Sequence, residues 1–241
     1  MNMWTTLLLA SQDASATPEV VAQSFEQLAP PLQIALFLGA MSFAVAALIS
    51  LTAFTRIIIV LSFVRRALST QEIPPNQVLL GLSLFLTLFV MAPVFETIYQ
   101  EGVEPYLVAQ QSEQPDVSVI DVFRVVSREL HAFMRMHTRK NDLALFVELS
   151  DTPTTITLEE IPLKVLIPAF IISELKTSFI MGFCIYIPFL LIDLVISTVL
   201  MSLGMMMMPP VVVSTPCKLL LFVLVDGWHL ICQALVASFG I

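Results

Sequence analysis

The chain has 241 residues, of which 57% are apolar and 12% charged, and its net charge is −8. Soluble domains carry about 25% charged residues, so this composition indicates a membrane protein or a component of a membrane complex. The negative charge, and a sequence without a stripe rich in Lys and Arg, argue against nucleic acid as a partner.

Residues 1–31 precede the first long apolar run and allow two interpretations. A short apolar stretch at 4–10 is followed by Ala14-Ser15-Ala16, which resembles the cleavage site of a secretory signal. The basic residues that begin such signals are missing from this stretch. We therefore expect a leader that is either signal-like or simply polar.

Residues 32–95 predict a first helical hairpin. The run 32–54 has 23 residues without a charge, which is long enough to cross the hydrocarbon core of a bilayer. Arg56 interrupts the apolar pattern, which then resumes. A Pro-Pro-Asn string at 74–76 indicates a turn, and 78–95 is a second charge-free run of 18 residues.

Residues 96–164 form a polar region. They hold 12 of the 19 acidic residues and 6 of the 11 basic residues of the chain, so we expect them to face water. Apolar residues recur with helical spacing over 119–138, and Ser118 and Asp121 are suited to cap that helix. A second short helix is expected over 142–149.

A second hairpin is predicted over 165–241, opened by a Thr-Leu-Glu-Glu capping-box pattern at 157–160. Within it, Gly204 precedes four consecutive methionines, and Pro209 and Pro210 follow them. This punctuation indicates a break between helices, so the methionines should lie at the tip of the hairpin. Methionine clusters usually fill gaps in a core; the alternative is a soft, uncharged plug over a narrow channel. The four residues are Met205, Met206, Met207 and Met208.

Charged residues interrupt the apolar segments. The bases are Arg56, Lys176 and Lys218, and the acids are Glu174, Asp193 and Asp226. A charge at the centre of a bilayer costs roughly 2.5–3.5 kcal/mol on insertion scales, so each charge needs a partner on another helix, on another subunit or in water. Glu174 and Lys176 are two positions apart and do not face each other on a helix. Structural ion pairs between helices are one interpretation, and a direct role in ion or proton movement is the other.

The sequence carries no pattern for catalysis. It has no Gly-rich phosphate loop ending in Gly-Lys-Ser/Thr, no H-E-x-x-H and no G-x-S-x-G. Its three cysteines lie in separate apolar runs, and His131 and His137 are six positions apart, a poor helical spacing for a shared metal. We therefore expect no enzyme activity, no cofactor and no metal.

Loop charge predicts an orientation in the membrane. Arg56, Arg65 and Arg66 lie near the turn of the first hairpin, so the positive-inside rule places that turn toward the cytoplasm. Both chain ends and the region 96–164 would then face outward.

Three uncommon strings occur in order along the chain. They are Phe-Thr-Arg-Ile-Ile-Ile-Val-Leu from 54 with Pro-Pro-Asn-Gln-Val-Leu from 74, then Ser-Glu-Leu-Lys-Thr-Ser-Phe from 173, then Leu-Gly-Met-Met-Met-Met-Pro-Pro from 203 with Lys-Leu-Leu-Leu-Phe-Val-Leu-Val-Asp-Gly-Trp from 218. Over roughly 32–241 they resemble the FliP family, the export-gate component of the bacterial flagellar type III secretion apparatus. The SctR proteins of injectisomes share the pattern, although the strings near 66–79 look more flagellar.

This resemblance implies an all-α protein made of two long, kinked helical hairpins and a helical connector. Several copies would assemble with the FliQ and FliR proteins into a helical channel, with FlhB and FlhA below. The channel would pass unfolded flagellar export substrates across the inner membrane at the basal body. Although hydropathy suggests four spans, the assembled helices would lie largely on the periplasmic side, in contact with each other and with membrane lipid. The family's methionine loop, here Met205 to Met208, would form a gasket around the closed pore.

Other functions remain open on sequence alone. An injectisome export-gate subunit would share the same strings. A small-solute transporter or ion channel would explain the apolar runs and buried charges, but it predicts internal repeats, and the two hairpins show no convincing repeat. A passive membrane scaffold without a pore is a third possibility.

Overall fold

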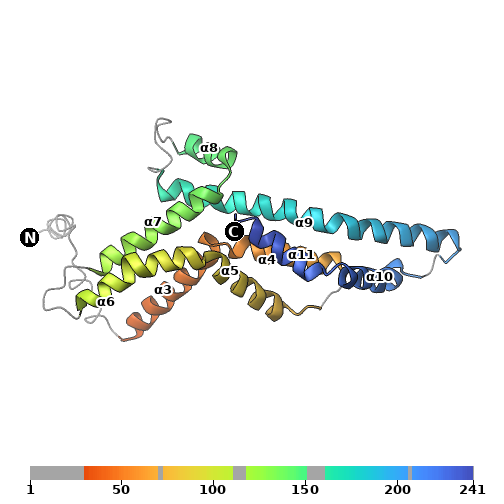
Figure 1. Cartoon of the computed structure of the whole chain (residues 1–241), viewed down its shortest axis with the longest axis horizontal. Helices are drawn as coiled ribbons and strands as arrows, with labels where there is room; N and C mark the ends of the chain where they lie inside the picture. Colours follow the sequence, from red (N-terminus) through yellow and green to blue (C-terminus); the bar gives the residue numbers. More distant parts are fainter. Residues whose placement is uncertain (1–29, 70–72, 111–117, 151–160, 206–207, 241) are drawn as a thin grey trace, which may run out of the picture. The chain divides into compact units, whose positions relative to one another are not determined.

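The computed structural model describes residues 30–69, 73–110, 118–150, 161–205 and 208–240, and the regular structure in these ranges is helical, with no strand. The elements are α3 (Pro30–Leu51), α4 (Phe54–Ala67), α5 (Asn76–Ile98), the π-helical η1 (Tyr99–Val103), α6 (Glu104–Gln110), α7 (Val119–His137), α8 (Lys140–Leu149), α9 (Leu163–Ser202), α10 (Pro210–Leu224) and α11 (Gly227–Ala237) (Figure 1). The predicted all-α fold is confirmed. The leader predicted at 1–31 and the capping box predicted at 157–160 fall almost entirely outside the described residues.

The chain divides into two compact units, residues 1–48 and 49–241. The described part of the first unit is most of α3, an apolar helix of 22 residues without a charge. At 1.5 Å per residue such a helix is about 33 Å long, which matches the thickness of a bilayer core.

The core of the second unit lies where α4 packs against α9. Ile57, Val60, Leu61 and Val64 recur every three or four residues along α4, and all four are fully buried. Burial of each such side chain contributes about 1.5–3 kcal/mol. The two helices approach closely at Gly182, because a Cβ atom there would lie 2.6 Å from the ring of Phe63.

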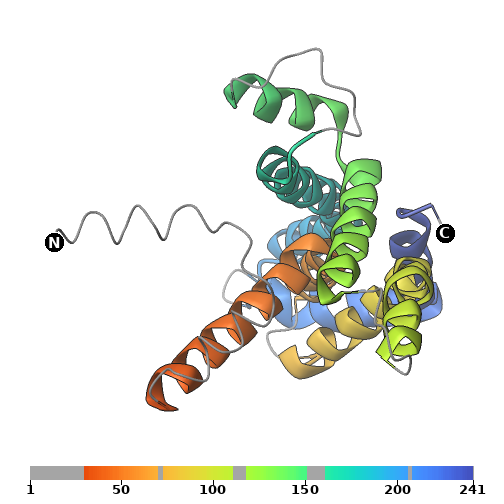
Figure 2. The same cartoon turned by 90° about the vertical axis from the view of Figure 1, so that its left-hand side faces the viewer.

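The polar region packs on this core through α7 and α8. Ser118 caps α7 by accepting from the backbone N–H of Ile120 at 3.3 Å, and the side chain of Asp121 accepts from the backbone N–H of Ser118 at 3.0 Å. This confirms the capping predicted for the helix. Seen after a quarter turn, α7 and α8 both lie against the first half of α9 (Figure 2).

The long helices fit the hydropathy of a membrane protein. Pro30–Leu51, Asn76–Gln110 and Leu163–Ser202 are each long and apolar enough to cross a bilayer. Pro210–Leu224 and Gly227–Ala237 meet the same criterion together, although they are bent by 65° relative to each other. The predicted four-span hydropathy therefore corresponds to three such helices and one broken pair among the described residues.

Candidate functional site

The methionine turn, residues 203–209, joins α9 to α10 at one end of the second unit (Figure 1). Gly204 adopts φ +75°, its N–H donates to the carbonyl of Met201 at 3.1 Å, and the N–H of Met205 donates to the carbonyl of Leu200 at 3.0 Å. This pair of bonds is a Schellman motif, which satisfies the last carbonyls of a helix and favours Gly at that position. Pro210 then begins α10 at a position where a missing N–H costs nothing.

The described methionine side chains of the turn are open to their surroundings. Met205 is 43% and Met208 is 40% exposed, and the N–H of Met208 donates to the carbonyl of Met205 at 3.3 Å. The other two predicted gasket residues, Met206 and Met207, lie outside the described residues. Since Met205 and Met208 are not buried in this chain, the core-filling interpretation does not account for them.

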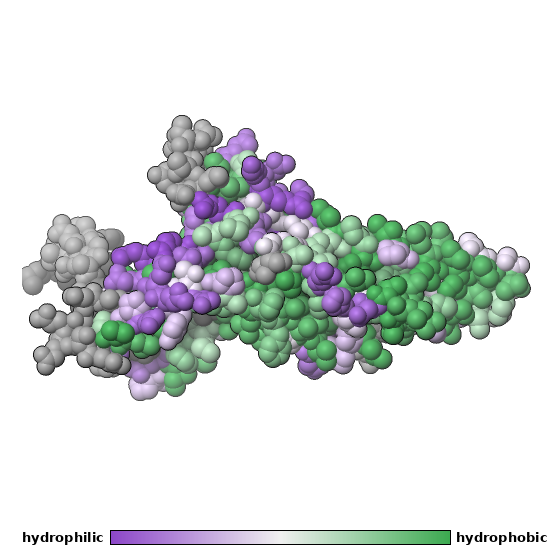
Figure 3. All heavy atoms as spheres, viewed as in Figure 1, coloured by the Kyte–Doolittle hydropathy of each residue, from purple (hydrophilic) through white to green (hydrophobic). Residues whose placement is uncertain are grey.

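The helices that carry the methionine turn present an apolar surface. Figure 3 shows hydrophobic residues along the far half of α9 and along α10, while hydrophilic residues gather over α7 and α8. Exposed members include Leu190, Leu194, Val199, Val212, Leu220 and Leu224. A continuous apolar face of this kind marks a surface that contacts lipid or other protein.

Arg56 holds three separate helices together, and we call its contacts the Arg56 junction. Its Nε donates to one carboxylate oxygen of Glu174 on α9 at 2.8 Å, and its Nη2 donates to the other. Its Nη1 donates to the carbonyl and the hydroxyl of Ser238, just after α11, at 2.9 and 3.0 Å. Arg56 is 3% and Glu174 is 0% exposed, so this is a buried bidentate ion pair of the stronger kind.

Aromatic rings surround the Arg56 junction. The guanidinium carbon lies 3.8 Å from the centre of the Phe239 ring, a cation–π contact. The same ring lies 5.2 Å from His137. Burial of the His137 ring, with a further contribution from the nearby Arg56 charge, lowers the pKa of His137 from 6.5 to about 4.

A second set of contacts, the Lys218 junction, lies nearer the methionine turn. The ammonium group of Lys218 on α10 donates to one carboxylate oxygen of Asp193 on α9, and to the hydroxyl of Ser69 after α4 at 2.6 Å. Lys218 is 1% exposed. The other carboxylate oxygen of Asp193 and the hydroxyl of Ser214, one turn before Lys218, are buried and have no hydrogen-bond partner in the part of the chain that the structure describes.

Two of the six charges lie at the surface of the chain. Lys176 is 51% exposed, and its ammonium group lies 3.9 Å from a carboxylate oxygen of Asp142 on α8, because it points to the polar side of α9. Asp226 is exposed at the bend between α10 and α11. Among the described residues its carboxylate has no ion-pair or hydrogen-bond partner.

No pattern in the sequence indicated several of the partners of these charges. Ser69, Asp142 and Ser238 lie in segments without a distinctive pattern, and Ser238 is 182 positions from Arg56. The sequence indicated that a buried charge needs a partner, but it did not indicate which residue is that partner. Within the described ranges, no three His, Cys, Asp or Glu side chains gather where they could hold a metal ion.

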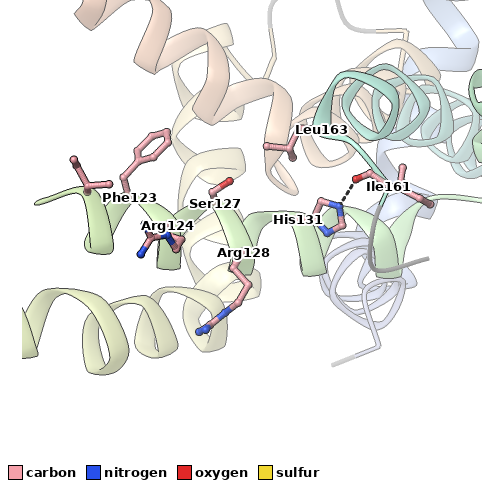
Figure 4. A pocket seen from close by; sticks show the side chains of 8 residues that line it. Phe123, Arg124, Ser127, Arg128, His131, Ile161 and Leu163 are labelled. Atoms are coloured by element: carbon pink, nitrogen blue, oxygen red, sulfur yellow. Dashed lines mark hydrogen bonds between the residues drawn. The ribbon is translucent and has the colours of Figure 1, made fainter. Parts of the chain in front are cut away.

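An open groove of about 510 Å³ runs along α7. In Figure 4, Phe123 and Ser127 point to one side of α7 and Arg128 to the other, and the His131 ring is bonded to the carbonyl of Ile161 at 2.8 Å. The arginines of the groove are already paired, Arg124 with Asp121 at 2.6 Å and Arg128 with Glu101 and Glu129. The groove therefore offers a surface for contact rather than a set of groups for catalysis.

Comparisons with known proteins agree on one family. A sequence model of the FliP family matches residues 37–235. The chain is 49% identical to a flagellar biosynthetic protein FliP of Bacillus subtilis (strain 168), over 89% of this chain and 94% of that protein. It is 50% identical to the protein of the same name from Pectobacterium carotovorum subsp. carotovorum, over 86% of this chain and 78% of the relative. It is 42% identical to the protein of the same name from Aquifex aeolicus (strain VF5), over 88% of this chain and 87% of the relative. The matched residues include the methionine turn and all six charged residues predicted above.

Proposed function

The chain belongs to the FliP family, whose members are flagellar biosynthetic proteins of the export apparatus, and we propose that it is a channel subunit of the flagellar type III protein export gate. In this role it passes unfolded flagellar subunits across the bacterial inner membrane. The observation that carries the proposal is the exposure of Met205 and Met208, the described methionines of the turn, at the end of a long apolar hairpin.

We infer that Met205, Met206, Met207 and Met208 form a gasket that closes the pore. Thioether side chains are unbranched and polarizable, so they fill irregular gaps by dispersion contacts and repack with little strain. A ring of uncharged side chains also excludes ions by dewetting. Charged or hydrogen-bonding groups in the same place would conduct ions or retain particular substrates.

The gasket requires several copies of the chain, because one turn cannot surround a pore. The exposed apolar face of α9 and α10 supports this, since it needs lipid or other subunits to cover it. We propose FliQ and FliR proteins as further subunits, with FlhB and FlhA proteins below them. The chain is then a structural component and not an enzyme, and its substrates are passengers.

We place the assembly in the inner membrane at the flagellar basal body, with much of it on the periplasmic side. The long apolar helices support the membrane location. The hydrophilic surface over α7 and α8 supports an outward, water-facing position for 96–164 (Figure 3). The groove along α7 is a candidate contact between subunits in that region.

Conductance in planar bilayers tests the gasket. We expect the assembled complex with all four methionines replaced by alanine to conduct ions, because the smaller side chains leave the constriction open. Met136→Ala is the matched control, since Met136 is 79% exposed on α7, remote from the turn. The proposal is contradicted if the four-alanine complex assembles normally on native gels and conducts no more than the unmodified complex. The methionines would then not close the pore.

A further inference from the structure

The hairpin that carries the methionine turn is broken in its second half, between α10 and α11. The two helices meet at 65°, and Asp226 at the bend has φ 51° and ψ 53°, the left-handed conformation. Residues with a Cβ atom rarely adopt that conformation, and Asp is one of the few that do. The bend is therefore a specific backbone feature and not a continuation of helix.

The bend is packed around one aromatic ring. A Cβ atom on Gly227 would lie 2.3 Å from the ring of Phe222, so Gly is required there. The Phe222 ring also lies edge-on to Trp228, with centres 5.3 Å apart. Ring contacts of this kind keep α10 and α11 joined, yet they are not directional in the way that a hydrogen bond is.

The two sides of the bend are held differently. Beyond α11, Ser238 accepts two hydrogen bonds from Arg56, and Phe239 stacks on the same guanidinium. On α10, the polar contact with the rest of the chain in the described residues is that of Lys218 with Asp193 and Ser69. Apolar contacts also hold α10 to α9, including those of the Phe189 and Phe222 rings, whose centres lie 6.3 Å apart. For polar attachment, the segment between the bend and the methionine turn depends on the Lys218 junction.

The Lys218 junction is also the less completely satisfied of the two. Among the described residues, one oxygen of Asp193 and the hydroxyl of Ser214 are buried without partners, whereas both oxygens of Glu174 and all three guanidinium nitrogens of Arg56 are hydrogen-bonded. Partly satisfied buried networks lose stability that complete networks keep. In addition, the Asp193 side chain is 30% exposed, so water can replace Lys218 as its partner at little cost.

We propose that the bend at Asp226 is a hinge: when Lys218 separates from Asp193 and Ser69, α10 swings and moves its end of the methionine turn, while α9 and α11 stay fixed at Arg56. The hinge motion follows from the contacts within this chain and does not depend on its function. That the motion opens a gate rests on the proposed function.

Spin-label distance measurements on the assembled complex test the hinge. Labelled copies are diluted with unlabelled ones, and Cys184, Cys217 and Cys232 are replaced by alanine. One pair places labels at Val212 on α10 and Leu194 on α9, and the reference pair places them at Leu230 on α11 and Leu194. All three positions are more than half exposed.

We expect Lys218→Met to add a longer-distance population to the Val212–Leu194 pair and to leave the Leu230–Leu194 pair unchanged. Asp226→Gly, which widens the range of backbone conformations open to the bend, should enlarge that population further when combined with Lys218→Met. Lys164→Met, which removes an exposed lysine at the start of α9, should change neither pair. If Lys218→Met does not assemble, Ser69→Ala decides instead, since it removes one of the two partners of Lys218.

Unchanged distances at both pairs in Lys218→Met would overturn the hinge, and so would equal broadening of both pairs, which indicates general loosening. Bilayer conductance of the same samples separates the two proposals. A longer Val212–Leu194 distance without added conductance keeps the hinge and contradicts the role in gating. Added conductance without a distance change contradicts the hinge but not the proposed role of the chain as a gate.

Discussion

The Arg56 junction joins α9 to α4 and to the end of α11, and the Lys218 junction joins α9 to α10 and to Ser69 after α4. The two junctions differ in completeness. Arg56 uses all three of its nitrogens, and its acid partner is fully buried and bonded at both oxygens. Lys218 has two partners, one of which is partly exposed and keeps an unbonded oxygen. Burial of a charge alone therefore does not hold a helix in position, since the completeness of the hydrogen bonding of that charge also matters.

The largest expected effect comes from breaking the Arg56 junction. Glu174→Ala leaves a buried guanidinium without its counter-charge, which should destabilise the protein by about 3–5 kcal/mol. Thermal unfolding and assembly on native gels measure this. The double change Arg56→Met with Glu174→Leu is the control, because replacing a whole buried pair with apolar groups costs much less. If Glu174→Ala melted like the unmodified protein, the junction would not be a structural anchor.

A smaller loss is expected at the Lys218 junction. Lys218→Met should cost about 1–3 kcal/mol, the range for leaving one acceptor without a donor, because Asp193 is partly exposed and regains water. The same unfolding measurement gives the value. A loss as large as that of Glu174→Ala would contradict the ranking of the two junctions.

Acid should weaken the Arg56 junction through His137. Folding lowers the pKa of His137 from 6.5 to about 4, so the folded state favours the neutral ring. That contribution is complete above pH 6.5 and is lost as the pH falls toward 4. By pH 4.5 we expect a loss of about 1–2 kcal/mol, less than the full shift implies because solvent screens the partly exposed ring. His137→Gln removes this loss. His229→Gln on α11, which changes an exposed ring, should keep the full acid dependence; equal curves for both variants would contradict this assignment.

The smallest effects should have opposite signs at two serines. Ser238→Ala removes one hydrogen bond to Arg56 and should cost about 1 kcal/mol. Ser214→Ala removes a buried hydroxyl that has no partner, so it should be neutral or stabilising by up to about 1 kcal/mol. Denaturant unfolding midpoints resolve the two. Destabilisation by Ser214→Ala would mean that its hydroxyl is bonded in the folded protein.

Patterns of local origin were readable from the sequence. The helical period and capping residues predicted α7, and the Gly and Pro residues around the methionines predicted a break between α9 and α10 at the position where the structure has its turn. Each depends on residues within a few positions of one another. Helix α9 runs without a break through Pro168 and Pro188, so proline inside an apolar run did not end the helix.

The pairing of distant charges was not readable. The sequence indicated that Arg56, Glu174 and Lys218 need partners. Glu174 and Ser238 lie 118 and 182 positions from Arg56, and Asp193 and Ser69 lie 25 and 149 positions from Lys218, so spacing along the chain did not identify them. Lys176 lies on the exposed side of α9 and pairs with Asp142 on α8, a partner that the sequence did not indicate. Tertiary packing determines these contacts, and residue spacing in a single sequence does not predict that packing.

Hydrogen–deuterium exchange of the unmodified assembled complex tests the difference between the two junctions most directly. Amide protection reports the free energy of local opening. We predict that the amides of α10 exchange faster than those of α4 and of α9 around Glu174, because α10 opens without the Arg56 junction. Equal protection of α10 and α4 would contradict the account.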